Sequence, residues 1–440
     1  MITATAARRR FVAVSALLWL APGLQMATMV LLLAARGADI ATISLVMVTH
    51  GVVVTALELP TGGVSDVIGR RGVIAASALL GALSAIGLAF ATATWLFLTA
   101  VVLKGVARAL SSGSAEAWYV DTVRAADATA SLRQGLSQGH AAGSVALAVG
   151  TVIGGAIPFL VPLPDDGFLV PLAVPMLLAA AVSLTLLVVA VTAMPEPPRT
   201  EPTPVGWKDL LRGVPATVAH GLQLGLGDSV LRRLLLTVAV SGLALYAVET
   251  FTPLRMADLT DDATTAGLAY GVATTVGFAA SALGSTLSPW LADRLSLQAT
   301  AAVGAAIAAL SMLGLAASGG LSGAAGIAIA VGAYAGLFIG LGIVSPVRSE
   351  LLHDRISSSE RATILSVDSL ALQGGGVVGA FSLAYLASSV APTAAWWVAG
   401  GALLAAAGVY LALRVPTRVP SPAACPTTGP PRPEATLRQP

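Results

Sequence analysis

The sequence has few of the residues that build disulfide scaffolds, metal sites and water-exposed surfaces. It contains one cysteine, Cys425, and four histidines in 440 residues. A single thiol excludes a disulfide framework, and no Cys/His cluster has metal-ligand spacing. Only 10% of the residues are charged, whereas soluble domains carry about 25%. The net charge of +2 gives no reason to expect a nucleic-acid partner.

Motifs for common enzymatic chemistry are also missing. The chain has no G-x-x-x-x-G-K-[ST] loop for ATP, no nucleophile elbow and no H-E-x-x-H helix. We therefore expect no enzymatic activity, no cofactor and no metal. An intramembrane transferase is the rival class, but it would need His or Asp clustered at one depth in several spans. A sensor that no longer transports is a third alternative, although such proteins usually carry an added soluble domain.

Long apolar runs make up most of what is present. Hydrophobic residues account for 56% of the chain, and the mean hydropathy is +0.85. About 20 apolar residues cross a bilayer, where each backbone group needs an internal hydrogen-bond partner, so each run predicts a helix. The first run continues to Ala35, too far for a signal peptide. The twelve predicted spans are residues 11–35, 40–61, 72–92, 95–119, 135–160, 168–193, 232–254, 265–289, 298–317, 322–345, 364–388 and 394–414.

The longest polar interruption divides these spans into six and six. We predict a short N-terminus (1–10), a first bundle (11–194), a central loop (195–231), a second bundle (232–415) and a disordered tail (416–440). Asp66 and Asp293 follow the second and eighth spans, 227 residues apart, and Arg133 and Arg361 precede the fifth and eleventh spans, 228 residues apart. This offset indicates a repeat of six-span halves, which is typical of secondary transporters with a site between the halves.

Basic residues lie mostly on one side of this predicted topology. Arg36 and Arg255 fall on the other side, Lys104 and Arg108 fall inside a span, and the remaining 20 of the 24 Lys and Arg share the first side. The positive-inside rule then places both termini in the cytoplasm. The sequence thus predicts a multi-pass protein of the cytoplasmic membrane. Its expected partners are the lipid bilayer and a small-molecule substrate, and we expect a functional monomer.

The loop between the second and third spans has a distinct pattern. In ELPTGGVSDVIGRRG (58–72), the spacing is G-x-x-x-D-x-x-G-R-R. Glycines allow close packing, and an aspartate can accept hydrogen bonds at a helix N-terminus. The alternative is a loop whose arginines only follow the positive-inside rule. Such a loop would need neither the glycines nor the aspartate at this spacing.

This spacing resembles the signature loop of the major facilitator superfamily. Val67 stands where the family usually has a basic residue, and Asp293-Arg294 resembles the decayed second copy of the loop. The resemblance covers residues 11–415 and implies an all-α fold of two pseudo-symmetric six-helix bundles that work by alternating access. It also implies that Asp66 bonds to the start of the eleventh span and stabilises the outward-open state. The predicted conformational latch comprises Gly62, Asp66, Gly69, Arg70, Arg71, Glu58 and Glu116.

Two partial matches resemble the drug:proton antiporters of that superfamily. Arg108 and Gly113 are one residue further apart than is usual in the fourth span of that group. Residues 150–155 are similar to its G-P-x-x-G-G pattern, with Thr151 in place of the proline. These matches favour proton-coupled export of a small amphiphilic molecule or drug. The alternative is a proton-coupled importer of a small metabolite.

Ionisable residues inside the spans are the main candidates for a site. Lys104 and Arg108 are four residues apart and share a helix face. A charge at the bilayer centre costs at least about 2.5–3.5 kcal/mol, so that face is expected to line a cavity or to form a structural ion pair. Glu249 is the first choice for the protonated group and Asp368 the second, with interhelical hydrogen bonds as the alternative role. The predicted coupling or cavity residues are Arg108, Lys104, Glu249, Asp368, Gln25 and Tyr246.

Overall fold

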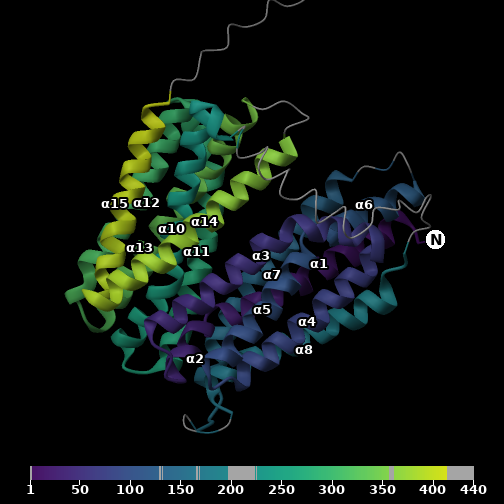
Figure 1. Cartoon of the computed structure of the whole chain (residues 1–440), viewed down its shortest axis with the longest axis horizontal. Helices are drawn as coiled ribbons and strands as arrows, with labels where there is room; N and C mark the ends of the chain where they lie inside the picture. The colour runs from purple at the N-terminus through teal and green to yellow at the C-terminus, as the bar shows by residue number, and fades with distance from the viewer. Residues whose placement is uncertain are drawn as a thin grey trace, which may run out of the picture.

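Two helical bundles, one from each half of the chain, make up the computed structural model (Figure 1). The structure describes residues 2–127, 130, 132–164, 167, 169–196, 223, 225–355 and 361–413. Within these ranges, residues 58–68, 133, 361–363, 365 and 366 are described by their backbone alone. The predicted tail (416–440) and most of the predicted central loop lie outside the described residues.

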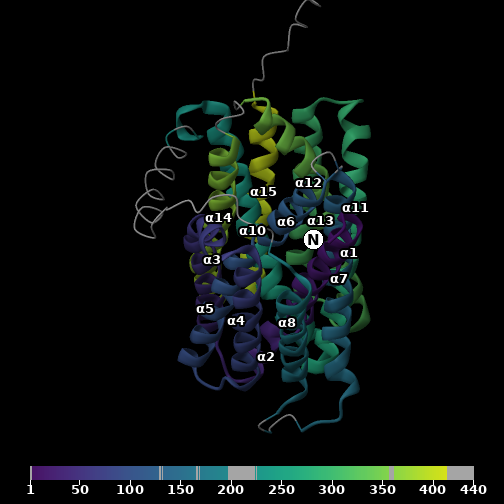
Figure 2. The same cartoon turned by 90° about the vertical axis from the view of Figure 1, so that its right-hand side faces the viewer.

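The N-terminal bundle contains six spans, of which the first and the fourth are each built from two helices. Its elements are α1 (Ala4–Met26), α2 (Met29–Ala35), α3 (Ile40–Ile68), α4 (Arg70–Phe90), α5 (Thr94–Ser111), α6 (Ser114–Ala126), α7 (Arg133–Leu160), the 3-10 helix η1 (Pro171–Ala173) and α8 (Val174–Ala193). Viewed from the side of the N-terminus, this bundle lies in front, with α4 packed against α8 (Figure 2).

The C-terminal bundle contains the other six spans. Its elements are α10 (Ser229–Thr260), α11 (Ala263–Ala292), α12 (Leu297–Ala317), the 3-10 helix η2 (Ser318–Gly320), α13 (Gly323–His353), α14 (Arg361–Ser389) and α15 (Pro392–Leu411). Strong contacts join α11 to α13, α12 to α13 and α15, and α10 to α14.

The prediction of twelve spans is confirmed within the described part of the chain. Twelve helical segments there are long and apolar enough to cross a membrane. Four predicted extents were too short by more than five residues. The first span begins at Ala4 rather than at residue 11, and the fourth runs from Thr94 to Ala126 rather than from 95 to 119. The seventh span runs from Ser229 to Thr260 rather than from 232 to 254, and the tenth ends at His353 rather than at 345. Charged residues at the ends of these helices limited the predicted runs, although the backbone continues as helix through them.

The fourth span is interrupted where the backbone turns at a glycine. Gly113 has φ +71, in the left-handed region that glycine adopts without a side-chain clash. It separates α5 from α6 and lies one turn beyond Arg108. The turn between α5 and α6 therefore explains why a glycine follows Arg108 at this spacing.

The two bundles touch through α3 with α14 and α7 with α11. The approach of α7 to α11 is close enough to require glycine. A Cβ built on Gly155 lies 2.4 Å from the carbonyl oxygen of Gly267, a distance that side-chain atoms do not adopt. Nearby, the Thr275 hydroxyl donates to the carbonyl of Ala148 at 3.3 Å.

The ends of the molecule differ in how the bundles are joined. At the end where α2 lies, here called the packed end, one apolar core contains residues of both bundles, such as Leu31, Val46 and Tyr246. At the other end, here called the terminal end, each bundle has its own core. Phe11 and Trp118 belong to the N-terminal one, and Leu234 to the C-terminal one. The bundles accordingly diverge toward the terminal end, where the N-terminus lies (Figure 1).

Candidate functional site

A cavity of about 480 Å³ lies between the two bundles. Met29, Val30 and Tyr270 line it and also belong to the core shared by both bundles, so this core closes the cavity toward the packed end. Most of the lining comes from α1, α2, α3, α4, α5, α7 and α8, and the remainder from α10 and α11. Most lining side chains are apolar, with the ionisable groups concentrated on a few helices.

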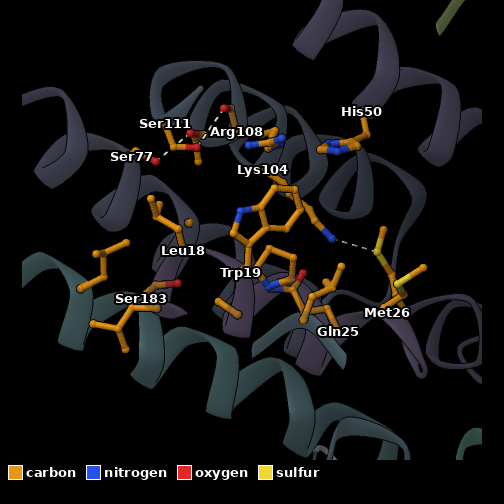
Figure 3. A pocket seen from close by; sticks show the side chains of 18 of the residues that line it. Leu18, Trp19, Gln25, Met26, His50, Ser77, Lys104, Arg108, Ser111 and Ser183 are labelled. Atoms are coloured by element: carbon orange, nitrogen blue, oxygen red, sulfur yellow. Dashed lines mark hydrogen bonds between the residues drawn. The ribbon is translucent and has the colours of Figure 1, made fainter. Parts of the chain in front are cut away.

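Two cations from α5 form one wall of this cavity. Lys104 and Arg108 both line it, because residues four apart lie on the same face of a helix. The Nζ of Lys104 lies 3.4 Å from the Sδ of Met29 (Figure 3). The Arg108 guanidinium stacks over the Trp19 ring, with Cζ 4.7 Å from the ring centroid. We call Lys104 and Arg108 the cationic pair.

Gln25 and His50 add polar groups near the cationic pair. Gln25 lines the cavity from α1 and is only 5% exposed. Its Oε1 has no hydrogen-bond partner among the described residues. His50 lines the cavity from α3 and lies beside Lys104 (Figure 3). A buried amide oxygen without a partner is costly, which indicates that a bound molecule or water completes its hydrogen bonding.

Glu249 is the acid on the opposite side of the cavity. It projects from α10, and its side chain is open to the cavity rather than packed in the bundle. No described Lys, Arg or His lies within 4 Å of its carboxylate. Tyr270 also lines this side and meets Tyr334 edge to face, with ring centroids 5.9 Å apart. The C-terminal wall thus combines one carboxylate with aromatic rings.

Four of the six residues predicted for coupling or the cavity therefore come together around it. Lys104, Arg108 and Gln25 come from the N-terminal bundle and Glu249 from the C-terminal bundle. The other two lie elsewhere. Asp368 is in a bidentate ion pair with Arg348, between α14 and α13. Tyr246 donates its hydroxyl to Ser44 of α3, in the contact between the bundles.

The predicted latch residues divide into two groups. The side chains of Glu58 and Asp66, and the surroundings of Gly62, lie outside what the structure describes. Gly69 has φ +99 and immediately precedes α4, a conformation that favours glycine. Arg71 is partly exposed.

Two charged residues of the latch, Arg70 and Glu116, have partners within the N-terminal bundle. The Nε of Arg70 lies 3.5 Å from an Asp121 carboxylate oxygen of α6. Glu116 lies 3.4 Å from His140 of α7. A contact from Asp66 to the start of α14 stays a prediction.

His50 was missed by the sequence analysis, which also gave Tyr270 no role. His50 is the one histidine in the predicted second span, 40–61, and that isolation in an apolar run was the available signal. No comparable signal marks Tyr270, because its place opposite the cationic pair depends on how α11 packs against the other bundle.

The twelve spans, the two bundles and the cavity between them together indicate a membrane transporter with its site between two halves. The family comparison agrees, because the model described as "Major Facilitator Superfamily" matches residues 11–348. The chain belongs to the Major Facilitator Superfamily. No curated protein sequence matches it significantly.

Solved structures with the same fold cover nearly the whole chain. The nucleoside transporter NupG aligns with a TM-score of 0.74 at 14% identity, covering 92% of this chain and 98% of its own. A D-xylose-proton symporter aligns with a TM-score of 0.69 at 15% identity, covering 91% and 96%. A bacterial homologue of the iron transporter ferroportin, in an inward-facing state, has a TM-score of 0.68 at 15% identity, covering 92% and 98%. At such identities the likeness establishes the fold alone.

Proposed function

We propose that this chain is a proton-coupled secondary transporter of a small, partly apolar molecule, with Glu249 as the group that binds the proton. The observation that carries the proposal is the placement of Glu249. It is open to the cavity from the C-terminal bundle, while the cationic pair lines the cavity from the N-terminal bundle. Acidic residues inside membrane spans are rare and typically mark proton or substrate pathways.

A proton on Glu249 acts on the relative position of the bundles. As a carboxylate, Glu249 attracts the cations on the facing wall, and protonation removes that attraction. Proton binding therefore changes the relative stability of arrangements in which the two walls are close or apart. Rocking of the bundles would expose the cavity alternately to the two ends of the molecule.

The orientation proposed is the one with both termini in the cytoplasm. Labelling of an Asp261→Cys variant from outside by an impermeant thiol reagent tests it.

Two directions of transport use the same residues. Export in exchange for protons is favoured by the partial antiporter-like spacings, since Arg108 lines the cavity and Gly155 lies in the contact between bundles. Uptake together with a proton is favoured by the described lining of the cavity, which contains two cations, Lys104 and Arg108, and one acid, Glu249. The fold serves such uptake in the neighbour named a D-xylose-proton symporter.

The experiment combines cells and membrane vesicles. A bacterial strain without its main efflux pumps, expressing the chain, is tested for toxicity and accumulation of a compound panel with and without a protonophore. Compounds that respond are then added to vesicles that contain a pH-sensitive dye and an imposed pH gradient. We expect proton movement that depends on the compound, and we expect Glu249→Gln to abolish it while binding of the compound persists. Transport by Glu249→Gln driven by the gradient at the wild-type rate would overturn the proposal.

A further inference from the structure

We propose that the molecule bound in this cavity is a small organic anion, whose carboxylate is held by Lys104 and whose apolar body lies against the aromatic and aliphatic lining. The inference rests on the proposed function, because it takes Glu249 as the proton site. It goes further by assigning the chemical class of the substrate, and with it the relation between proton and substrate movement.

The first argument is the state of Lys104. An ammonium group offers three hydrogen-bond donors. Among the described residues, the hydrogen-bond partner of Nζ is a methionine sulfur, Sδ of Met29, which is a weak acceptor. A lysine inside a membrane span is costly unless an anion or strong acceptors surround it. A carboxylate bound in the cavity supplies both the opposite charge and strong acceptor oxygens.

The second argument is the arrangement around Lys104. Arg108 lies one turn further along the same face and presents its guanidinium over the Trp19 ring, so a second positive charge faces the same space. Gln25 is 5% exposed and lines the cavity, with its amide oxygen unpartnered among the described residues. Two cations and an amide oxygen without a described hydrogen-bond partner thus lie at one wall of the cavity. We take this wall as the polar end of the site.

The third argument concerns the rest of the lining. Away from the polar end, the lining includes Leu18, Leu147, Leu186 and Phe278. Such surfaces favour an apolar body, because apolar area is removed from water on binding. A zwitterion would place its ammonium on Glu249, but there it would compete with the proton that the proposed function assigns to this residue. The lining therefore selects a monoanion with a hydrophobic portion.

This assignment determines how proton and substrate are coupled. An ionised Glu249 repels an anion in the same cavity, and a protonated Glu249 does not. The proton and the anion then strengthen the binding of one another, because coupling between two sites is reciprocal. Both ligands therefore move in the same direction. A cationic substrate would instead compete with the proton and would be exchanged for it.

The test uses the purified full chain in lipid nanodiscs and three probes that share one ring system, namely 2-naphthoate, 2-naphthamide and 2-naphthylmethylammonium. Dissociation constants are measured by calorimetry at pH 7. We expect naphthoate to bind at least about tenfold more tightly than the amide, which corresponds to about 1.4 kcal/mol. Equal binding of acid and amide, or tighter binding of the ammonium probe or of the zwitterion naphthylalanine, would overturn the assignment.

Variants of Lys104 test whether this residue causes the preference for naphthoate over naphthamide. Lys104→Gln is expected to remove the advantage of naphthoate over naphthamide, whereas Lys104→Arg keeps the positive charge and most of the advantage. Arg232→Gln is the matched control, because Arg232 is an exposed cation of α10 whose side chain donates to the carbonyl of Leu226, outside the cavity. If Lys104→Gln and Arg232→Gln both bind naphthoate like wild type, Lys104 is not the anchor and the proposal fails.

A pH series separates the substrate class from proton coupling. Naphthoate stays ionised between pH 6 and 8, because carboxylic acids titrate near about 4. Its affinity should rise toward pH 6 in wild type and become independent of pH in Glu249→Gln. The other ionisable groups that line this space are His50, Lys104, Arg108 and Tyr270, and Tyr334 lies behind Tyr270. Histidine is the residue type among them whose unperturbed pKa lies nearest this range.

A His50→Asn variant tests this rival source of pH dependence. Loss of the pH dependence in this variant would assign the titration to His50 and overturn the proton role of Glu249. Preference for the anion without any pH dependence would overturn co-movement and the proton role of Glu249 while retaining the substrate class. Proton-driven transport without preference for the anion would overturn the substrate class while retaining the proton role of Glu249.

Discussion

The packed end and the terminal end of the molecule join the same two bundles in different ways. At the packed end, residues of both bundles share one apolar core, and Gly155 brings α7 into contact with α11. At the terminal end, the bundles have separate cores, and the described ion pairs there, such as Arg70 with Asp121, lie within one bundle. Apolar packing therefore closes the cavity at one end. At the other end, the described charged groups of the predicted latch are paired within the N-terminal bundle.

This difference indicates what the proposed alternation of access would require of each end. The apolar contact at the packed end must separate, and its close fit depends on residues without side chains. A contact at the terminal end would form from charged groups, of which Asp121 and Glu116 are about half exposed in the present arrangement. Charged groups can form and break such a contact, because water hydrates them when they separate and offsets the loss of the ion pair.

The first prediction breaks the packed end. In Gly155→Val, the Cβ alone would lie 2.4 Å from the Gly267 carbonyl oxygen. The two helices must therefore move apart to accommodate the side chain. Overpacking costs about 1–3 kcal/mol, which shifts the population of the packed arrangement by up to about 100-fold. We expect transport to be lost while the protein still inserts and unfolds cooperatively, as measured in vesicles and by thermal unfolding. Gly332→Val is the control, because no atom lies within 4 Å of a Cβ built there. Equal activity of the two variants would contradict this account of the contact.

The second prediction concerns the terminal end and the expected latch. Asp66→Asn preserves the volume of the side chain and removes its charge. If Asp66 anchors the N-terminus of α14 when the terminal end closes, transport should fall by about tenfold, because a charge-assisted contact contributes about 1.5–3 kcal/mol. Insertion and unfolding temperature should stay at the wild-type values. Wild-type transport by correctly inserted Asp66→Asn protein would refute the latch.

The third prediction compares the acid of the cavity with an acid of the terminal end. Asp368 is paired with Arg348, and the two side chains are 14% and 15% exposed, so Asp368→Asn leaves a largely buried guanidinium without its partner. Loss of one member of such a pair costs about 3–5 kcal/mol of unfolding free energy. We expect a lower unfolding temperature with proton coupling retained per folded molecule. If Asp368→Asn is stable but no longer couples, and Glu249→Gln still couples, the proton role belongs to Asp368.

The fourth prediction concerns a helix start at the packed end. Asp262 precedes α11 and accepts hydrogen bonds from the backbone amides of Thr264 and Thr265. Burial raises the pKa of Asp262, but hydrogen bonds from Thr265 and Thr264 outweigh it and lower the pKa to about 2. A lowered folded-state pKa stabilises the protein above the unfolded pKa near 4. This contribution disappears as the pH falls toward 2.

Asp262→Ala should therefore lower the unfolding free energy by about 1 kcal/mol at pH 7 and by much less at pH 2.5. Thermal unfolding in detergent over this range is the measurement. Asp262→Asn retains a capping oxygen and should lose little stability at pH 7. Because Asp262→Asn also removes the titrating carboxylate, its stability relative to wild type should change with pH as that of Asp262→Ala does. A stability difference that does not change with pH in either variant would show that the charge of Asp262 does not contribute.

The sequence alone determined the class of fold and part of the site. Apolar length fixed the number of spans, because a backbone in lipid must form helices of a given length. The near-constant offset between Asp66 and Asp293, and between Arg133 and Arg361, identified the two halves. Lys104, Arg108, Gln25 and Glu249 were identified because ionisable and polar residues within spans are costly unless they face a cavity or a partner.

Only the tertiary structure decided which of these candidates meet. Asp368 and Glu249 look alike in sequence, as single acids in apolar runs, but Arg348 packs beside one and the cavity opens beside the other. Tyr246 was predicted for the cavity and Tyr270 was given no role. The packing of α10 and α11 against the first bundle places Tyr270 at the cavity and Tyr246 in the contact with Ser44. Contacts between helices depend on rotation and crossing angle, which small differences in side-chain shape determine. Composition and spacing place a residue in the membrane, but they do not fix the direction in which it faces.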